Sequence, residues 1–164
     1  MIRPANALRL LPLAGLALLS ACGKPDGELT AGQWKSTMQM TRFDVPGAPP
    51  AMQEQLKAMI GRSQSAESCM SAAEAKAGVR DFSKNAQQGD CKLEDYTQGG
   101  GKMSGKLVCK GTPFGDQGMK IEGTYTDKMV ELTMSGNIEQ PSIPGGKASM
   151  AMKVTSERIG DCAK

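Results

Sequence analysis

Apolar and polar residues alternate along much of this chain, with the two-residue period of a half-buried β-strand. The first such segment starts at Trp34, and its apolar positions continue through Met38 and Met40. Segments with the same alternation follow at 91–97, 103–109, 119–125, 130–135 and 148–155. Together they predict a curved antiparallel sheet of about six strands in a meander, each strand with one apolar face.

Two short segments have helical periodicity instead. In residues 50–60, a proline suited to the first helical position precedes apolar residues on one face, namely Met52, Leu56, Met59 and Ile60. In the second segment, Ser71 and Glu74 have the spacing of a capping box, and Gly78 would end the helix after two turns. We expect the first helix to lie on the sheet, which makes the fold class α+β.

The glycine run 99–101 marks a hairpin turn between two of the predicted strands. If the hairpin is centred on Gly100, one register pairs three sets of residues across the strands. These are Cys91 with Cys109, Leu93 with Leu107, and Glu94 with Lys106. A slip by one residue would lose all three pairs, so the sequence predicts a Cys91–Cys109 disulfide.

The N-terminus has the parts of an export signal. Arg3 and Arg9 precede an apolar run over 10–19, which is too short to span a bilayer, and Leu19-Ser20-Ala21 leads directly into Cys22. This pattern is typical of a bacterial lipoprotein, whose cysteine is acylated with chains such as palmitate. We therefore expect a lipoprotein signal peptide over 1–21, a lipid anchor and tether over 22–31, and a single sheet-rich domain over 32–164.

The predicted location is the periplasmic side of the outer membrane. Gly23 follows the cysteine, where inner-membrane lipoproteins typically have aspartate. Removal of Arg3 and Arg9 from the 20 basic residues leaves 18 against 17 acidic residues, a net charge of +1. Such a chain has no field to attract nucleic acid, and its membrane attachment would depend on acyl chains.

The remaining cysteines are even in number, as expected for disulfides in an oxidising compartment. Of five cysteines, acylation of Cys22 leaves four, and pairing Cys91 with Cys109 leaves Cys69 and Cys162 to pair by elimination. The chain has no histidine and no Cys-x-x-Cys motif. We therefore expect no metal site built on cysteine or histidine.

No catalytic residues can be assembled from the sequence. Histidine, the commonest general base near neutral pH, is missing, and no serine lies in a Gly-x-Ser-x-Gly or Ser-x-x-Lys motif. The glycine run 99–101 lacks the Gly-Lys-Ser/Thr ending of a phosphate-binding loop. The sequence predicts a protein that is not an enzyme and needs no cofactor.

Methionine is unusually frequent, with twelve residues against six aromatic ones. The first interpretation is that methionine fills a core short of aromatic residues. The second is binding of Cu(I) through thioether sulfurs, and the third is an apolar or acyl ligand on a methionine-lined sheet face. The candidate ligand-facing residues are Met38, Met40, Met150, Met152 and Trp34.

The order of short motifs resembles a known family. They are Gly32-x-Trp34, Cys69-Met70 before the capped helix, Cys91, the glycine run 99–101, Cys109, Gly123-Thr124-Tyr125 and Arg158-x-Gly160-x-Cys162. This order resembles the exported proteobacterial proteins grouped as domain of unknown function 3617, over about Glu28 to Cys162. The resemblance implies a secreted or lipid-anchored, four-cysteine, sheet-rich domain without an established activity, so it transfers no catalytic residue.

The function expected from the sequence is a non-enzymatic role in envelope maintenance, through binding of a partner or ligand. Three classes stay open at this stage. A carrier would hold an apolar or acyl ligand, a soft-metal binder would hold Cu(I) through methionines, and an adaptor would bind another envelope protein.

Overall fold

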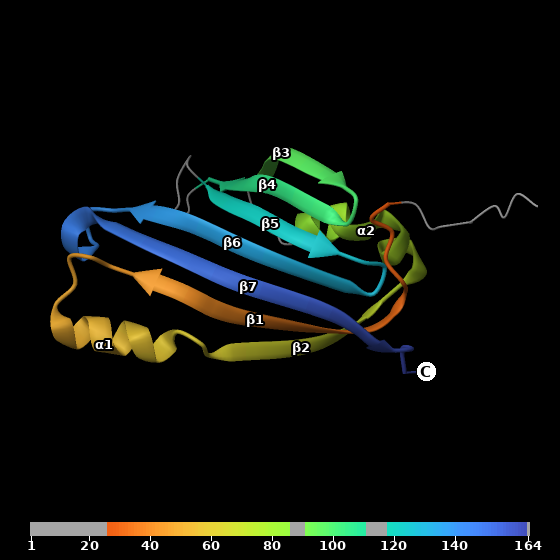
Figure 1. The fold of residues 1–164 in the computed structure, drawn as a ribbon, viewed down its shortest axis with the longest axis horizontal. Helices are drawn as coiled ribbons and strands as arrows, with labels where there is room; N and C mark the ends of the chain where they lie inside the picture. The colour runs from red at the N-terminus through yellow and green to blue at the C-terminus, as the bar shows by residue number, and fades with distance from the viewer. Residues whose placement is uncertain (1–25, 86–90, 111–117, 164) are drawn as a thin grey trace, which may run out of the picture.

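A computed structural model describes residues 26–85, 91–110 and 118–163 (Figure 1). The expected signal peptide 1–21, the expected acylation site Cys22 and residues 23–25 lie outside the described residues. The elements in chain order are β1 (Gly32–Asp44), α1 (Pro50–Met59), β2 (Ser63–Met70), α2 (Ala72–Asn85), β3 (Cys91–Gly99), β4 (Lys102–Cys109), β5 (Met119–Tyr125), β6 (Met129–Glu139), the 3₁₀ turn η2 (Pro144–Gly146) and β7 (Lys147–Gly160).

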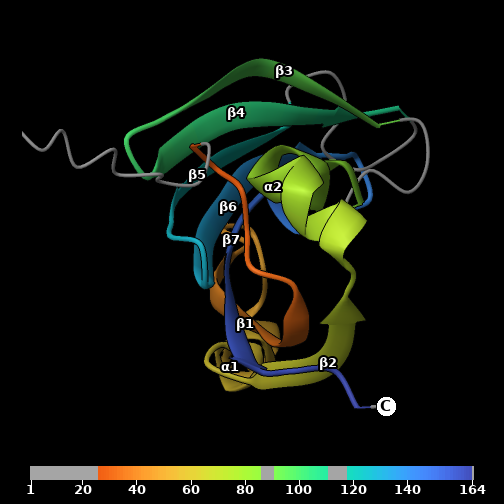
Figure 2. The ribbon, with the colours of Figure 1, turned by 90° about the vertical axis from the view of Figure 1, so that its right-hand side faces the viewer.

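All seven strands form one antiparallel sheet in the order β2-β1-β7-β6-β5-β4-β3. Strands β3 to β7 are a meander, and β7 then pairs with β1, so the first and last strands are neighbours. The sheet is strongly curved, and α2 lies on its inner side (Figure 2). Helix α1 lies at the other end of the sheet, where β1 ends (Figure 1). This curvature leaves an inner face and an outer face of different chemistry.

The predicted hairpin register holds at the open end of β3 and β4. Cys91 pairs with Cys109, Leu93 with Leu107, and Glu94 with Lys106, as expected. Closer to the turn a bulge between Glu94 and Thr97 shifts the register by one residue. The two turn residues Gly100 and Gly101 both have positive φ, which a two-residue hairpin turn of this kind requires.

The sheet has seven strands, one more than the six we expected. The additional strand is β2, an edge strand that pairs only with β1. Residues 63–69 are exposed on both faces of β2, so their sequence carries no alternation of apolar and polar positions. Hydrogen bonds to β1 and the disulfide at its end hold this strand, and neither leaves a periodic hydrophobic signal.

Helix α1 forms where predicted, but our expectation that its apolar side lies on the sheet was wrong. The helix has no buried residue, and Met52 and Met59 are 40 % and 46 % exposed. Only Leu56 packs against a core cluster, which lies in the loop that enters the helix and at the adjoining end of β6 and β7. The amphipathic pattern therefore identified the helix but not its surroundings.

Helix α2 starts with the predicted capping box. The Ser71 backbone N–H and hydroxyl donate to Glu74 Oε2 at 2.8 and 2.7 Å, and the Glu74 N–H donates to Ser71 Oγ at 3.3 Å. These hydrogen bonds lower the pKa of the Glu74 carboxyl. Gly78 interrupts the helix at φ 71°, where its backbone passes close to Gly27. Helical structure then resumes to Asn85, beyond the end we predicted.

The inner face carries two separate cores. The larger lies beneath α2 and combines Leu29, Trp34, Ala75, Val79, Met103, Leu107, Ile121, Tyr125, Val130 and Leu132. The smaller lies at the α1 end and combines Val45, Ala48, Ile138 and Ala148. The stretch of inner face between these two cores is where the candidate site lies.

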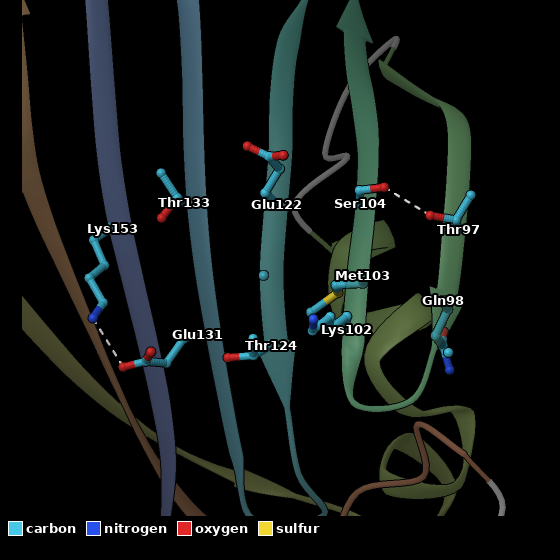
Figure 3. A pocket seen from close by; sticks show the side chains of 12 residues that line it. Thr97, Gln98, Lys102, Met103, Ser104, Glu122, Thr124, Glu131, Thr133 and Lys153 are labelled. Carbon is cyan, nitrogen blue, oxygen red and sulfur yellow. Dashed lines mark hydrogen bonds and ion pairs between the residues drawn. The ribbon is translucent and has the colours of Figure 1, made fainter.

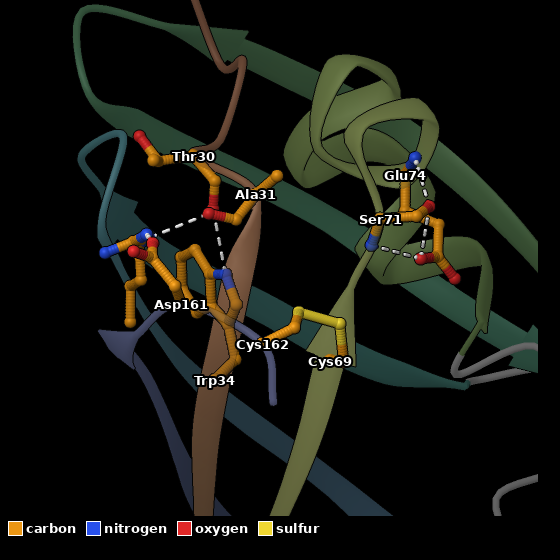
Figure 4. Close-up of a disulfide and its surroundings, with 9 residues drawn as sticks. Thr30, Ala31, Trp34, Cys69, Ser71, Glu74, Asp161 and Cys162 are labelled. Carbon is orange, nitrogen blue, oxygen red and sulfur yellow. Dashed lines mark hydrogen bonds and ion pairs between the residues drawn. A yellow bond between two sulfur atoms is a disulfide. The ribbon is translucent and has the colours of Figure 1, made fainter. Parts of the chain in front are cut away.

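Two disulfides close the fold, in the pairs expected from the sequence. Cys91–Cys109 links β3 to β4, and Cys69–Cys162 links the end of β2 to the residues after β7 (Figure 4). The second bridge holds the edge strand β2 to the end of the chain, 93 residues further on. It lies beside the capping box of α2, so strand, helix and C-terminal segment meet at one point.

Candidate functional site

A methionine row crosses three strands of the inner face. Met40 of β1 lies directly opposite Met152 of β7, which lies opposite Met134 of β6. Facing residues in an antiparallel ladder have Cα atoms about 4.5–5.5 Å apart, so these side chains are neighbours. The next pairs on either side continue the apolar surface, with Met38 opposite Val154 and Phe43 opposite Met150.

We call this surface the methionine face and define it as Met38, Met40, Met134, Met150, Met152 and Val154. It lies between the two cores and is only partly covered. Met38 is 49 % exposed, and the other five residues are half-buried. Methionine side chains are flexible and polarizable, so such a surface can adapt its shape to an apolar ligand.

Of the five ligand-facing candidates, the structure brings four together and separates one. Met38, Met40, Met150 and Met152 share the methionine face because β1 and β7 are adjacent and in register. Trp34 is on the same face of β1 but is only 2 % exposed, because it is part of the larger core. Its indole N–H donates to the Thr30 carbonyl at 3.0 Å, so Trp34 serves packing and not ligand contact (Figure 4).

Met134 belongs to the methionine face, although the sequence did not single it out. It occupies an apolar position of β6, like Leu132, and nothing local distinguishes it from a core residue. Only the pairing of β6 with β7 places it against Met152. Strand order was thus the missing information.

The outer face of the sheet has a different character. A groove of about 770 Å³ crosses β3 to β7 on this side, and we call it the polar groove (Figure 3). Hydroxyl and charged side chains line it, including Thr97, Ser104, Glu122, Glu131, Thr133 and Lys153. These are the polar positions of the same strands whose apolar positions form the inner face.

The polar groove holds no activated nucleophile among its described residues. The Ser104 hydroxyl is hydrogen-bonded to the Thr97 hydroxyl at 2.8 Å, and threonine is no general base. Glu131 is paired with Lys153 at 3.0 Å, and Glu122 with Lys120 at 2.8 Å. This surface can hydrogen-bond a polar molecule.

Residues 26–31, which we expected to be part of a tether, pack into the domain instead. The Leu29 N–H donates to the Ala75 carbonyl of α2 at 2.9 Å, and the Thr30 N–H donates to the Asp127 carbonyl at 2.7 Å. Leu29 is 2 % exposed and belongs to the larger core. The segment therefore fills the space between α2 and the sheet, which the glycine and polar content of its sequence did not indicate.

Asp26 fixes the start of this segment. Its carboxylate accepts hydrogen bonds from the Tyr125 hydroxyl at 2.7 Å and the Gly100 N–H at 3.1 Å, and its carbonyl accepts one from the Gln98 amide at 3.1 Å. Burial, and then the bond to Asp26, raise the pKa of the Tyr125 phenol above its ordinary value. The β3–β4 turn, through Gly100, and the β5–β6 turn, through Asp127, thus both contact the segment 26–31.

In the described parts of the chain, no three acidic or cysteine side chains gather closely enough to hold a metal ion. A soft metal would therefore depend on the methionine row, since thioethers are ligands for Cu(I). None of the helices in those parts is long and apolar enough to cross a membrane.

Comparison with known proteins gives a family but no activity. Residues 29–162 match the sequence model described as "Protein of unknown function (DUF3617)". This range contains both disulfides, the methionine face and the polar groove; of the described residues, only 26–28 and 163 lie outside the match. No curated protein and no solved structure matches the chain.

Proposed function

We propose a role that is argued from the chain's own residues, because the family to which the chain belongs, DUF3617, consists of proteins of unknown function. The protein is a non-enzymatic lipoprotein on the periplasmic side of the outer membrane. There it holds an apolar ligand, an acyl chain, on the methionine face. The ligand class follows from the surface that the sheet leaves partly exposed.

The observation that carries this proposal is the position of the methionine face between two closed cores. The buried apolar side chains of the described inner face gather beneath α2 or at the α1 end. The intervening row is partly exposed: Met38 is its most exposed member, while Met134 and Val154 border the larger core and Met150 borders the smaller one. Each methylene that an acyl chain buries there would contribute about 0.8 kcal/mol, so several methylenes can offset the entropy lost on binding.

The location is supported by the N-terminal sequence. Two arginines, the apolar run 10–19 and the small residues before Cys22 combine the features of a lipoprotein signal. The two disulfides fit an oxidising compartment. A protein anchored by acyl chains at a lipid surface would meet acyl ligands at high local concentration.

The test is titration with a fluorescent fatty acid, cis-parinaric acid. The chain carries Cys22→Ser and is exported behind a leader that is removed without acylation, so that neither an acyl chain nor the apolar leader can occupy the face. The double variant Met40→Gln/Met152→Gln places two polar amides in the row and should weaken binding at least about tenfold, equal to about 1.4 kcal/mol. Thr133→Gln, on the outer face of β6, is the matched control and should bind like the parent. Equal affinity in all three proteins would reject the proposal.

A second candidate, Cu(I) binding, is favoured by the alignment of three thioethers in the row Met40–Met152–Met134. The variant Met40→Leu/Met152→Leu separates the two functions, because leucine keeps the apolar surface but removes the sulfur. An acyl-binding face would retain parinaric acid in this variant. A copper site would lose Cu(I), measured by competition with a chromogenic Cu(I) chelator, while the parent protein retains it.

A further inference from the structure

We propose that a very short tether holds one particular end of the domain against the membrane. This end carries Asp26, the β3–β4 turn and the β5–β6 turn. It faces the lipid headgroups, and the α1 end points away from them. The inference rests on the proposed acylation of Cys22 and adds to it the orientation of the domain and the lipid-contacting surface.

Asp26 is fixed to the domain by several hydrogen bonds. Side-chain and backbone atoms of this residue accept hydrogen bonds from Tyr125, Gly100 and Gln98, which belong to three different strands or turns. One residue later, the Gly27 carbonyl accepts a hydrogen bond from the Val79 N–H of α2 at 3.0 Å. The sheet and the helix both bind the chain here, so Asp26 cannot extend the tether without loss of these contacts.

Only three residues, 23–25, separate Asp26 from Cys22. A fully extended chain spans at most about 3.6 Å per residue, so the Cα atom of Asp26 can be no further than about 14 Å from that of Cys22. This limit holds for every conformation of the intervening residues. An acylated Cys22 lies at the level of the headgroups, so the Asp26 end of the domain must lie there too.

The surface around Asp26 suits a headgroup layer. Lys102 follows the β3–β4 turn, Lys128 ends the β5–β6 turn, and Met129 begins β6; all three are exposed. Lysine attracts the phosphates of anionic lipids, and a half-exposed methionine can enter the interfacial region. Asp127 and Asp26 carry negative charge nearby, so the surface alone binds lipid weakly, and the tether supplies the local concentration.

The orientation places the α1 end far from the membrane. Strand β6 leads from Lys128 to the loop that contains Ser142, and its eleven residues at about 3.3 Å each span about 36 Å. Figure 1 shows α1 and this loop at the opposite end of the long axis from the C-terminus. The methionine face lies between the two ends, within reach of a ligand arriving from the leaflet.

The test measures energy transfer from two labelled positions to the membrane. The full chain is produced with its own leader, purified, and reconstituted in phosphatidylethanolamine–phosphatidylglycerol vesicles with an acceptor dye on the headgroups. A donor dye is attached through Lys128→Cys or, as the matched distal variant, Ser142→Cys. Both positions are exposed, and neither side chain makes a described hydrogen bond. Transfer should be several-fold stronger from position 128.

A third protein tests the tether itself. It carries the label at position 128 and a flexible Gly-Ser insertion of ten residues after Gly23, which should lower the transfer. Equal transfer from positions 128 and 142, or unchanged transfer after the insertion, would overturn the orientation while leaving the anchor intact. If the chain does not sediment with the vesicles and mass spectrometry finds Cys22 unmodified, the proposed anchor itself has failed, and the orientation with it.

Discussion

At the scale of single residues, the hydrogen bond from the Tyr125 hydroxyl is one of three that join Asp26 to the sheet and its β3–β4 turn. Tyr125→Phe removes a hydrogen bond to a charged acceptor, but water can reach Asp26 in the variant. We expect the free energy of unfolding to fall by about 1–2 kcal/mol, measured by urea denaturation. Tyr96→Phe is the matched control, since its hydroxyl bonds the exposed Gln98 side chain, and it should cost less than about 0.5 kcal/mol.

The difference in the free energy of unfolding between the parent and Tyr125→Phe should depend on pH, because the Tyr125 phenol titrates. The pKa of Tyr125 in the folded protein lies above its ordinary value of 10.0, first because of burial and then because of Asp26. The stabilisation is therefore complete below pH 10 and is lost as the pH rises through the folded-state pKa. The gap in stability between the parent and Tyr125→Phe should narrow above pH 10. A gap that widens there would contradict the assigned contact.

At the scale of elements, the two disulfides should contribute unequally. The bridges close segments of 93 and 18 residues, and the loop-entropy relation gives about 4.6 and about 3 kcal/mol for them. Cys69→Ala/Cys162→Ala should therefore destabilise the protein more than Cys91→Ala/Cys109→Ala in urea denaturation. Amide hydrogen exchange should also accelerate first in β2, whose only strand partner is β1. A larger loss for the Cys91–Cys109 pair would show that β2 contributes little to cooperativity.

The elements also show how far the sequence determines this fold. Six strands followed from alternation because each buries one face, and the Cys91–Cys109 register followed because three residue pairs agreed on it. Strand β2 could not be found this way, since neither of its faces is buried. The apolar side of α1 predicted a helix but not its contacts, because amphipathicity does not specify the partner surface.

The candidate site was predictable to a similar extent. Alternation placed Met38 with Met40, and Met150 with Met152, on single strand faces. Whether these faces meet depends on which strands pair, and the β1–β7 pairing joins residues more than a hundred positions apart. The burial of Trp34 and the inclusion of Met134 depend on the same long-range contacts. Periodicity is local information, whereas a binding surface made by several strands is not.

At the scale of the whole molecule, attachment to the membrane and ligand binding should be separable. With the proposed leader 1–21 removed, the net charge is +1, which gives little electrostatic attraction to a bilayer, so the proposed attachment would depend on acyl chains. In the expressing bacterium, the parent chain should fractionate with the outer membrane, and Cys22→Ser behind a leader that is removed without acylation should fractionate with the periplasmic extract, each detected by immunoblot. The same variant should bind parinaric acid, because the methionine face belongs to strands far along the chain from residue 22. A Cys22→Ser protein that stays with the membrane would mean that the folded domain itself binds lipid, and the short tether would then not be needed to explain its position.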